Sequence, residues 1–345
     1  MSPILSSLVV VGGAFALSAA ATAWLARRSH SGLLDYPNER SLHQTPVPRS
    51  GGVGVLLGLA LPLLAVALVE GVDPALVWLG LAVVLVAGVS LWDDFGHVSR
   101  RLRLLFHGLA GLVLVTGGMV WSRLDLPGID WTFPGTLALG LTALYAAWMI
   151  NLYNFMDGMD GLAGGMGLFG FGALAVLGWQ GGEPLFGLVA ACTAAACAGF
   201  LTCNFPPARI FLGDLGSSTL GLLAAGLSLW GYRNGLFPLW AAWLAFSPFI
   251  VDATWTLLRR LARRERIWEP HRSHHYQRLA LAGWGHRKTV LRAYLVMAGA
   301  AACAVAAPNL PARDQWALLL GWAFIYILIG FRVRLAERHA EPEQP

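Results

Sequence analysis

The sequence has 345 residues, of which 57% are hydrophobic and 12% are charged, with a formal net charge of +5. Soluble globular domains have roughly 25% charged residues, so this composition excludes a water-soluble fold. The 41 glycines and 15 tryptophans are typical of closely packed membrane helices with aromatic side chains at the lipid–water interfaces.

Apolar runs long enough to cross a membrane, for which about 20 residues are needed, recur along the whole chain. They predict an all-α, polytopic membrane bundle of about eleven transmembrane helices. The first run has neither a basic region before it nor a cleavage site of small residues, so we expect a retained helix rather than a signal peptide. The runs cover residues 4–26, 52–70, 75–92, 104–121, 133–150, 162–179, 184–203, 210–230, 236–258, 289–307 and 314–331.

The loops between these runs fall into two alternating sets. One set carries only Arg123, Arg233 and Arg313, and the other set with the C-terminal tail carries the remaining 21 of the 24 basic residues. Because Lys and Arg accumulate on the cytoplasmic side, the N-terminus is predicted to be external and the C-terminus cytoplasmic. We expect a single membrane domain over residues 1–335, followed by a polar tail at 336–345.

Unusual polar segments occur only in the loops assigned to the cytoplasm. A transporter is expected to place polar groups near the middle of the membrane and accessible from both sides. The concentration of Asp residues at one surface instead favours an enzyme that works at the interface. The segments lie in the loops 27–51, 93–103, 151–161, 204–217 and 259–288.

Asp93 and Asp94 stand together at the end of the third apolar run. An adjacent pair of carboxylates at a helix end is often simply a solvated terminus. The C-terminal end of a helix carries the negative pole of its dipole, however, which disfavours acidic side chains. A cation must compensate, either Mg²⁺ or one of the nearby Arg100, Arg101 and Arg103, so the pair predicts a binding role.

Asn154, Asp157 and Asp160 recur at a spacing of three in a glycine-rich segment. This spacing brings side chains to one side of a helix or turn, and glycines let the backbone approach a ligand closely. A calcium loop of the EF-hand type would need further ligands and a Glu at its twelfth position, which the segment lacks. The three residues are therefore predicted to bind a ligand.

Asp214, in the segment FLGDLGSS, lies a few residues inside an apolar run. An unpaired charge there costs about 2.5 kcal/mol or more, which a structural ion pair would offset. The flanking Gly213, Gly216, Ser217 and Ser218 favour a surface for phosphate or a hydrated metal ion.

The segment HRSHHYQRL supplies His271, His274 and His275 together with Arg272 and Arg278. Zinc is the alternative ligand, since His binds it readily. No Cys is present in this segment, and the interleaved Arg offers forked donors to phosphate, so anion binding is the better interpretation.

Asp252 stands near the end of the ninth run, in SPFIVDATWTLLRR. It either pairs with Arg259 or Arg260 or belongs to the functional site, and the sequence leaves both interpretations open.

The order of these motifs is distinctive. WDDFG, NFMDGMDGLAGG, FLGDLGSS and HRSHHYQRL resemble the polyprenyl-phosphate N-acetylhexosamine-1-phosphate transferase family, also called glycosyltransferase family 4. The resemblance extends from about Asp35 to Arg287. The form of HRSHHYQRL is more similar to the O-antigen-initiating branch than to the peptidoglycan branch.

Residue roles follow from this resemblance. It implies that Asp93, Asp94 and Asp214 are catalytic, with Asp214 as the main Mg²⁺ ligand and Asp157 as a second one. It also implies a set of substrate-binding residues, namely Asn154, Asp157, Asp160, His271, His274, Arg278 and Arg103. Two departures occur, since His97 stands where many members have Asp, and His107 where Gln is expected.

The implied cofactor is Mg²⁺, with Mn²⁺ as an alternative, and the implied partners are a UDP-amino sugar and undecaprenyl phosphate. The resemblance places the enzyme in the bacterial inner membrane with a cytoplasmic active site, is compatible with a homodimer, and implies no nucleic-acid partner. As a hypothesis, the lipid phosphate attacks the β-phosphorus of the UDP-sugar and expels UMP, in one step or through an aspartyl phosphate. A CDP-alcohol phosphotransferase is disfavoured, because DGMDGLAGG lacks the Arg and later Asp residues of that motif.

Overall fold

The computed structural model describes residues 3–28, 34–35, 46–96, 98–266 and 271–340. His97 and parts of the predicted cytoplasmic loops, at 36–45 and 267–270, lie outside the described residues. The described part of the chain is almost entirely helical, which confirms the all-α, polytopic class. The helices are α1 (Pro3–Arg27), α2 (Gly51–Glu70), α3 (Pro74–Phe95), α4 (Arg100–Thr116), α5 (Gly135–Met156), α6 (Leu162–Gln180), α7 (Pro184–Asn204), α8 (Gly213–Arg233), α9 (Leu239–Ala245), α10 (Ser247–Ala262), α11 (His275–Leu279), α12 (Gly285–Ala306) and α13 (Ala312–Ala340).

Two antiparallel hairpins and two short helical turns complete the described elements. β1 (Leu34–Asp35) pairs with β2 (Val47–Pro48), and β3 (Arg123–Leu126) pairs with β4 (Ile129–Thr132). A π-helical turn, η1 (Ala280–Trp284), precedes α12, and a 3₁₀ turn, η2 (Ala307–Asn309), follows it.

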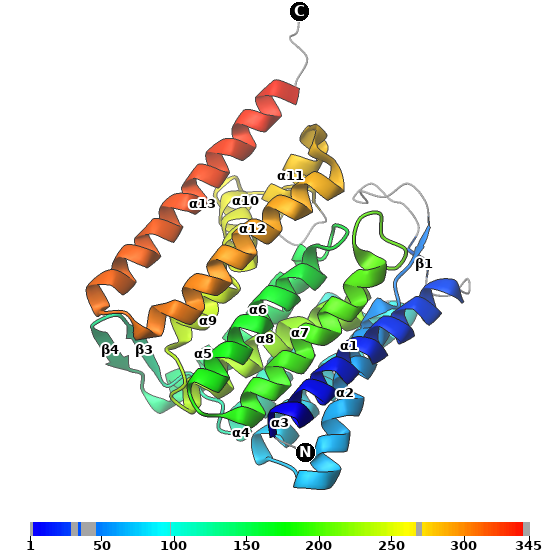
Figure 1. Cartoon of the computed structure of the whole chain (residues 1–345). Coiled ribbons are helices and arrows are strands. Elements are labelled where there is room, and N and C mark those ends of the chain that lie inside the picture. The colour runs from blue at the N-terminus through cyan, green and yellow to red at the C-terminus, as the bar shows by residue number, and fades with distance from the viewer. Residues whose placement is uncertain (1–2, 29–33, 36–45, 97, 267–270, 341–345) are drawn as a thin grey trace, which may run out of the picture.

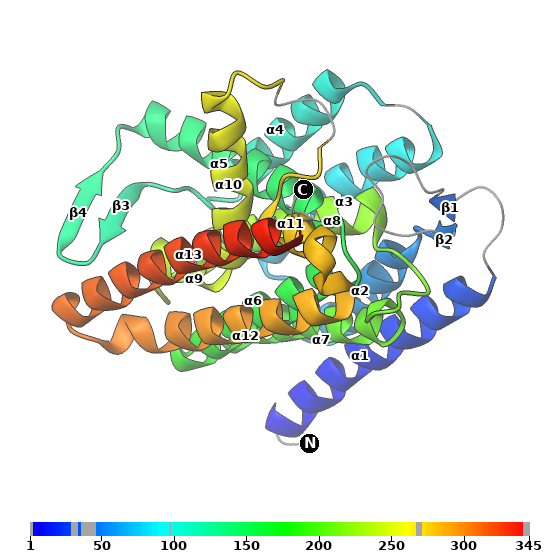
Figure 2. The ribbon, with the colours of Figure 1, turned by 90° about the horizontal axis from the view of Figure 1, so that it is seen from above.

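The helices run lengthwise in one bundle, with α1 and α2 at one edge and α12 and α13 at the other (Figures 1 and 2). α7 packs against α1 and α6, and α8 packs against α3 and α5. The middle helices form the core: α6 and α7 bury 72% and 78% of their most apolar stretches, whereas α13 buries only 11%. The apolar surface of α13 is thus left for lipid.

Every predicted apolar run contains helix, and eight helices are long and apolar enough to cross a membrane among the described residues. α4 has only 17 residues, and α8 begins with polar side chains, so neither belongs to these eight. The ninth run is not one straight helix, because it breaks between α9 and α10 with a bend of 84°. The count of eleven spans and the orientation of the termini stay predictions.

The break in the ninth run and the hairpin after α4 differ from the simple pattern of spans and plain loops. Pro248 stands in the first turn of α10, where proline is favoured because its missing N–H needs no partner. The segment 122–132, between the fourth and fifth predicted runs, forms the β3–β4 hairpin, which turns at Pro127 and Gly128. Gly128 adopts a φ of +72°, which the tight turn requires.

α2 and α8 approach each other closely at their N-terminal ends. The backbone N–H of Gly52 donates to the carbonyl oxygen of Leu212 over 2.8 Å. A Cβ atom added at Gly52 would lie 2.4 Å from the backbone nitrogen of Gly216. Because backbone cannot move aside as a flexible side chain can, glycine at Gly52 is a packing requirement, and this contact fixes where α8 begins.

Gly52→Ala is therefore expected to lower the free energy of unfolding by about 1–3 kcal/mol, the usual cost of overpacking. The measurement is the shift of the thermal unfolding midpoint in detergent. Gly80→Ala in α3 is the matched control, since a Cβ there meets nothing within 4 Å, and its midpoint should stay or rise. Equal midpoints for the two variants would contradict the packing contact.

Candidate active site

Asp93 and Asp94 end α3 and contact different arginines. Asp93 Oδ2 lies 2.6 Å from Arg103 Nη1 on α4, and Asp93 Oδ1 accepts the backbone N–H of Val98. Arg49 donates from Nη2 to the backbone carbonyl of Asp94, and its Nε lies 3.8 Å from Asp94 Oδ1. Arg103 is one of the arginines that were predicted to offset the negative charge at this helix end. Arg49 was not among the predicted residues.

Asp214 lies in the first turn of α8, where the positive pole of the helix dipole favours a carboxylate. Its Oδ1 accepts from Asn154 Nδ2 over 2.9 Å, and its Oδ2 lies 3.3 Å from Arg103 Nη1. Arg103 thus bridges Asp93 and Asp214, which are 121 positions apart along the chain. Asn154 Nδ2 also donates to Ser217 Oγ over 2.9 Å.

The turn into α8 depends on glycine and on the strand segment before α2. Gly213 adopts a φ of +75°, and a Cβ there would lie 2.3 Å from the carbonyl oxygen of Arg49. Asp94 Oδ2 accepts the backbone N–H of Leu215 over 3.2 Å. The C-terminal end of α3 and the N-terminal ends of α2 and α8 are therefore held together beside Asp214.

Asp157 follows directly after α5 and completes the acidic group. Burial and then the neighbouring carboxylates of Asp214, Asp35 and Asp94 raise the pKa of Asp157 to about 8. Among the described residues, Asp93, Asp94 and Asp214 are held close together by Arg49, Arg103 and the start of α8. A bound cation would favour the ionised form of the Asp157 carboxyl group and offset the charge of these carboxylates.

Asp160, predicted to contact substrate, joins three segments of the protein. Its Oδ1 lies 3.0 Å from His286 Nδ1 on α12, and its Oδ2 accepts the backbone N–H of Ala208 over 3.0 Å. Burial alone would raise the pKa of Asp160, but these partners hold it below its usual value. Beside it, Asn204 accepts from the Gly161 N–H and donates to the Ile210 carbonyl.

The segment at the start of α11 is anchored by Asp252 of α10. Asp252 Oδ1 accepts the backbone N–H of His275 over 2.9 Å, and the His274 Nδ1 and His275 Nδ1 atoms lie 3.5 and 3.6 Å from it. The sequence alternative, in which Asp252 pairs with Arg259 or Arg260, is thus replaced by contacts with the two histidines. Asp252 positions the loop that His274 belongs to.

Tyr276 links this loop to the acidic group. Its hydroxyl donates to the carbonyl of Phe155 over 3.4 Å, and a Cβ added at Gly158 would lie 2.3 Å from that hydroxyl oxygen. The loop therefore packs on the segment that carries Asp157. These contacts bring NFMDGMDGLAGG, FLGDLGSS and HRSHHYQRL together at one end of the bundle, as the sequence predicted.

Two members of the predicted loop set have other surroundings. Arg278 forms a bidentate ion pair with Glu337 of α13, so its guanidinium group faces that helix rather than the carboxylates. Burial, then His274 and Arg260, lower the pKa of His271 to about 4, so its ring is neutral at pH 7.

His107, the second departure from the family pattern, lies buried on α4. Its Nδ1 is 3.1 Å from Asn151 Nδ2 on α5. It joins two helices beside the site and has no described contact with the carboxylates. The other departure, His97, lies outside the described residues.

Fold and site together define a class: a multi-pass membrane protein whose helix ends gather carboxylates and arginines, the residues that phosphoryl-group chemistry uses. Residues 76–232 match the model of the family described as glycosyl transferase family 4. The chain is 30% identical over 309 residues to a probable undecaprenyl-phosphate N-acetylglucosaminyl 1-phosphate transferase of Bacillus subtilis (strain 168), covering 89% of this chain and 84% of the relative.

Two further relatives carry similar names. A decaprenyl-phosphate N-acetylglucosaminephosphotransferase of Mycobacterium tuberculosis (strain ATCC 25618 / H37Rv) is 31% identical over 330 residues, with 85% and 80% of the two chains covered. An undecaprenyl-phosphate alpha-N-acetylglucosaminyl 1-phosphate transferase of Escherichia coli (strain K12) is 27% identical over 319 residues, with 88% and 84% covered. The chain belongs to the polyprenyl-phosphate N-acetylhexosamine-1-phosphate transferase family and is a transferase, which disfavours the transporter alternative.

Proposed function

We propose that this enzyme transfers an N-acetylhexosamine 1-phosphate, or a related amino-sugar phosphate, from a UDP-sugar to undecaprenyl phosphate and releases UMP. The product is a lipid-linked sugar diphosphate of the kind that starts O-antigen synthesis, formed at the cytoplasmic face of a bacterial inner membrane. The names of the relatives and the form of HRSHHYQRL support this proposal.

The observation that carries the proposal is the convergence of Asp93, Asp94 and Asp214 beside Arg49 and Arg103. Both reactants are anions, so the site has to offset negative charge where the attacking and leaving oxygens meet. A cluster of carboxylates alone would repel them. Carboxylates combined with arginines suit an arrangement in which a cation and guanidinium groups lie between the two phosphates.

The donor atoms fit Mg²⁺, which prefers oxygen ligands and is usually held by one or two carboxylates together with substrate phosphates. Among the residues that the structure describes, no group of three His, Cys, Asp or Glu side chains forms a ready metal site. Asp94 Oδ1 is buried and accepts no hydrogen bond from the described residues. Asp214 and Asp157 are the proposed protein ligands, with Mn²⁺ as an alternative ion.

Bound Mg²⁺ would polarise the donor diphosphate and offset the charge that develops on its oxygens. An acceptor phosphate oxygen forms a bond to the β-phosphorus, while the bond from that phosphorus to the bridging oxygen breaks and UMP leaves with the electron pair. Arg103, oriented by Asp93, holds the acceptor phosphate in line. Asp93 itself stays the proposed group that positions this phosphate or accepts its proton.

A single displacement inverts the configuration at the β-phosphorus, whereas a route through an aspartyl phosphate retains it. We expect inversion, because Arg103 can hold the acceptor phosphate directly against the donor. A donor made chiral at the β-phosphorus, followed by analysis of the lipid product, separates the two routes. Net retention would show that a carboxylate of the site forms the covalent intermediate.

His274→Ala is expected to raise the KM for the UDP-sugar by about tenfold or more, with a much smaller change for the lipid, because a lost charge-assisted donor weakens binding of the donor diphosphate. Asp252→Asn should show the same selective rise, since Asp252 holds the loop through the His275 N–H and the His274 ring. Initial rates are measured while each substrate is varied in turn. An unchanged KM for the UDP-sugar in both variants would contradict the role of this loop.

The proposed reaction is tested with membranes or purified enzyme, undecaprenyl phosphate and a panel of UDP-amino sugars. UMP and the lipid-linked product should form in equal amounts with at least one donor. Absence of both products with every donor, from protein that is folded and supplied with Mg²⁺, would overturn the proposal.

A further inference from the structure

Trp284, at the last position of η1, is surrounded by three cations. Lys288 Nζ lies 4.9 Å, Arg292 Cζ 4.1 Å and Arg332 Cζ 5.9 Å from the centre of one of its rings. Lys288 and Arg292, at a spacing of four, share one face of α12, and Trp284 directly precedes that helix. Arg332 comes from α13, so the cluster joins the last two long helices.

The three cations of this Trp284 cluster have no carboxylate partner within 4.0 Å in the described part of the chain. Glu337, five positions after Arg332 on α13, is already paired with Arg278. Lys288, Arg292 and Arg332 are all exposed. Like charges gathered around one ring repel each other, and the ring offsets only part of this by cation–π attraction. A bound anion would relieve the repulsion.

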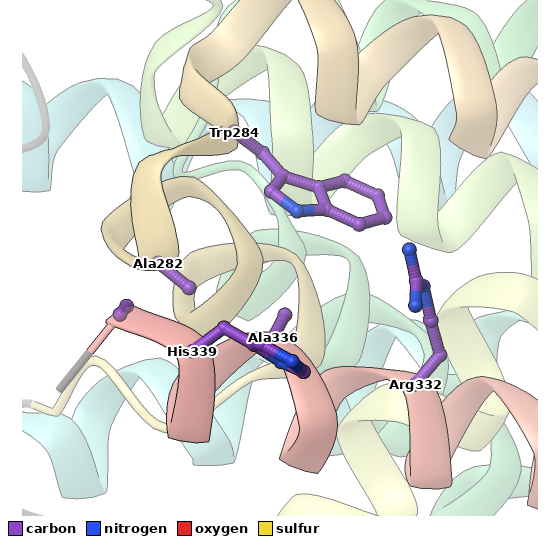
Figure 3. A pocket seen from close by; sticks show the side chains of 6 residues that line it. Ala282, Trp284, Arg332, Ala336 and His339 are labelled. Carbon is purple, nitrogen blue, oxygen red and sulfur yellow. The ribbon is translucent and has the colours of Figure 1, made fainter.

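Two hollows meet at Trp284 and Arg332. The first has a volume of about 280 Å³ and is lined by small and polar residues, among them Ala282, Ala336 and His339. In Figure 3 the indole of Trp284 and the guanidinium of Arg332 lie together at its side. This hollow suits a small polar group rather than a hydrocarbon chain.

The second hollow has a volume of about 290 Å³ and is also lined by Trp284, Arg292 and Arg332. Its remaining wall is mostly apolar, with Leu279, Val296, Met297 and Ile329 among the lining residues, and Asp252 and His275 line it as well. Apolar side chains in contact with a cavity of this kind suit a hydrocarbon chain. The cations therefore stand between a polar hollow and an apolar one.

The depth of the cluster in the membrane follows from its neighbours. His286, two positions after Trp284, pairs with Asp160 of the α5–α6 loop, so the cluster lies at the same end of the bundle as the carboxylates. Tryptophan and arginine are typical of the membrane interface, and basic pockets between helix ends bind lipid headgroups. The adjoining surface is apolar, since Leu295, Phe331 and Leu335 are exposed.

We propose that the Trp284 cluster binds an anionic glycerophospholipid of the phosphatidylglycerol type. Its phosphodiester would lie against Arg292, Arg332 and Lys288, its polar headgroup in the first hollow and one acyl chain in the second. A polyprenyl phosphate fits less well, because its phosphate is terminal and leaves nothing to fill the polar hollow. The acceptor phosphate also has Arg49 and Arg103 beside the carboxylates.

The test is lipid binding to the whole protein in mild detergent, measured by native mass spectrometry with phosphatidylglycerol and phosphatidylcholine as probes. The wild-type protein should prefer phosphatidylglycerol by about tenfold, and Arg292→Ala with Arg332→Ala should remove most of this preference, since each basic residue near an anionic lipid contributes appreciably. Arg334→Ala with Arg338→Ala, which removes two exposed charges from α13 outside the cluster, should stay within about two-fold of wild type.

Competition experiments identify the molecule that binds the Trp284 cluster. Undecaprenyl phosphate and inorganic phosphate should each fail to displace phosphatidylglycerol at equal concentration. Displacement by undecaprenyl phosphate would reassign the cluster to the acceptor lipid, and displacement by inorganic phosphate would show a site for free anions; both overturn the proposal. Unchanged phosphatidylglycerol binding in the double variant also overturns it. If the double variant unfolds, the single Arg332→Gln change at an exposed position replaces it, and unchanged binding in that variant overturns the proposal equally.

Because the readout is lipid binding rather than turnover, this proposal stands or fails separately from the transferase reaction.

Discussion

Asp214→Asn should abolish transfer, lowering kcat by about 10³-fold or more, because the carboxylate is the proposed main ligand of the cation that offsets transition-state charge. The fold should survive the change. The side chain of Asp214 is 37% exposed, and an Asn of equal size can still accept the hydrogen bond from Asn154. UMP release under saturating substrates, together with the thermal midpoint, measures both expectations.

Asp130→Asn is the matched control for this variant. Asp130 lies in the β3–β4 hairpin, is 58% exposed and pairs with Arg123, and exposed pairs contribute little, so turnover should stay within about two-fold. Near-normal Mg²⁺-dependent turnover in Asp214→Asn would refute the ligand role. Loss of folding without Asp214 would show that it acts in structure instead.

Removal of divalent ions should have an equally large effect. The carboxylates of Asp93, Asp94 and Asp214 lie close together, so without a bound cation they would repel both anionic substrates. We expect a chelator to lower turnover to background, a loss of about 10³-fold or more. Added Mg²⁺ or Mn²⁺ should restore it.

The chelation experiment has its own control, since the residual activity of Asp214→Asn should respond little to either chelator or Mg²⁺. Full turnover of the wild-type enzyme in excess chelator would show that arginines alone suffice. In that case Arg103, which lies between Asp93 and Asp214, would have to supply the charge that the cation is proposed to provide.

The sequence predicted the helices well because apolar runs of sufficient length have few alternatives to helix in a membrane. It did not predict where a run bends or a loop pairs. Counting apolar residues passes over Pro248, at the break between α9 and α10, and over Pro127 and Gly128, at the turn of the β3–β4 hairpin. Both signals are present in the sequence, but their effect depends on the surrounding helices.

In the candidate site, too, some features were predicted from the sequence and others were not. The sequence predicted that Asp93, Asp157 and Asp214 would converge, because each lies at a helix end assigned to one side of the membrane, and Arg103 joins the first and last of these. Arg49 was missed, since nothing local indicates that the chain before α2 would bond to the chain before α8.

Asp160 and Arg278 show contacts that the sequence did not indicate. Their types suited substrate binding, yet they pair with His286 and Glu337, partners more than fifty positions away that no local pattern reveals. Their substrate-binding roles stay predictions.

Binding of Mn²⁺ to the purified protein, followed by electron paramagnetic resonance, tests most directly whether carboxylates from separate helix ends share one ion. One bound Mn²⁺ per chain is expected for wild type, with affinity lowered by about tenfold or more in Asp157→Asn and in Asp214→Asn, since each removes one of few protein ligands. If Mn²⁺ does not bind, or binds both variants as tightly as wild type, the proposed ion between the two phosphates does not exist.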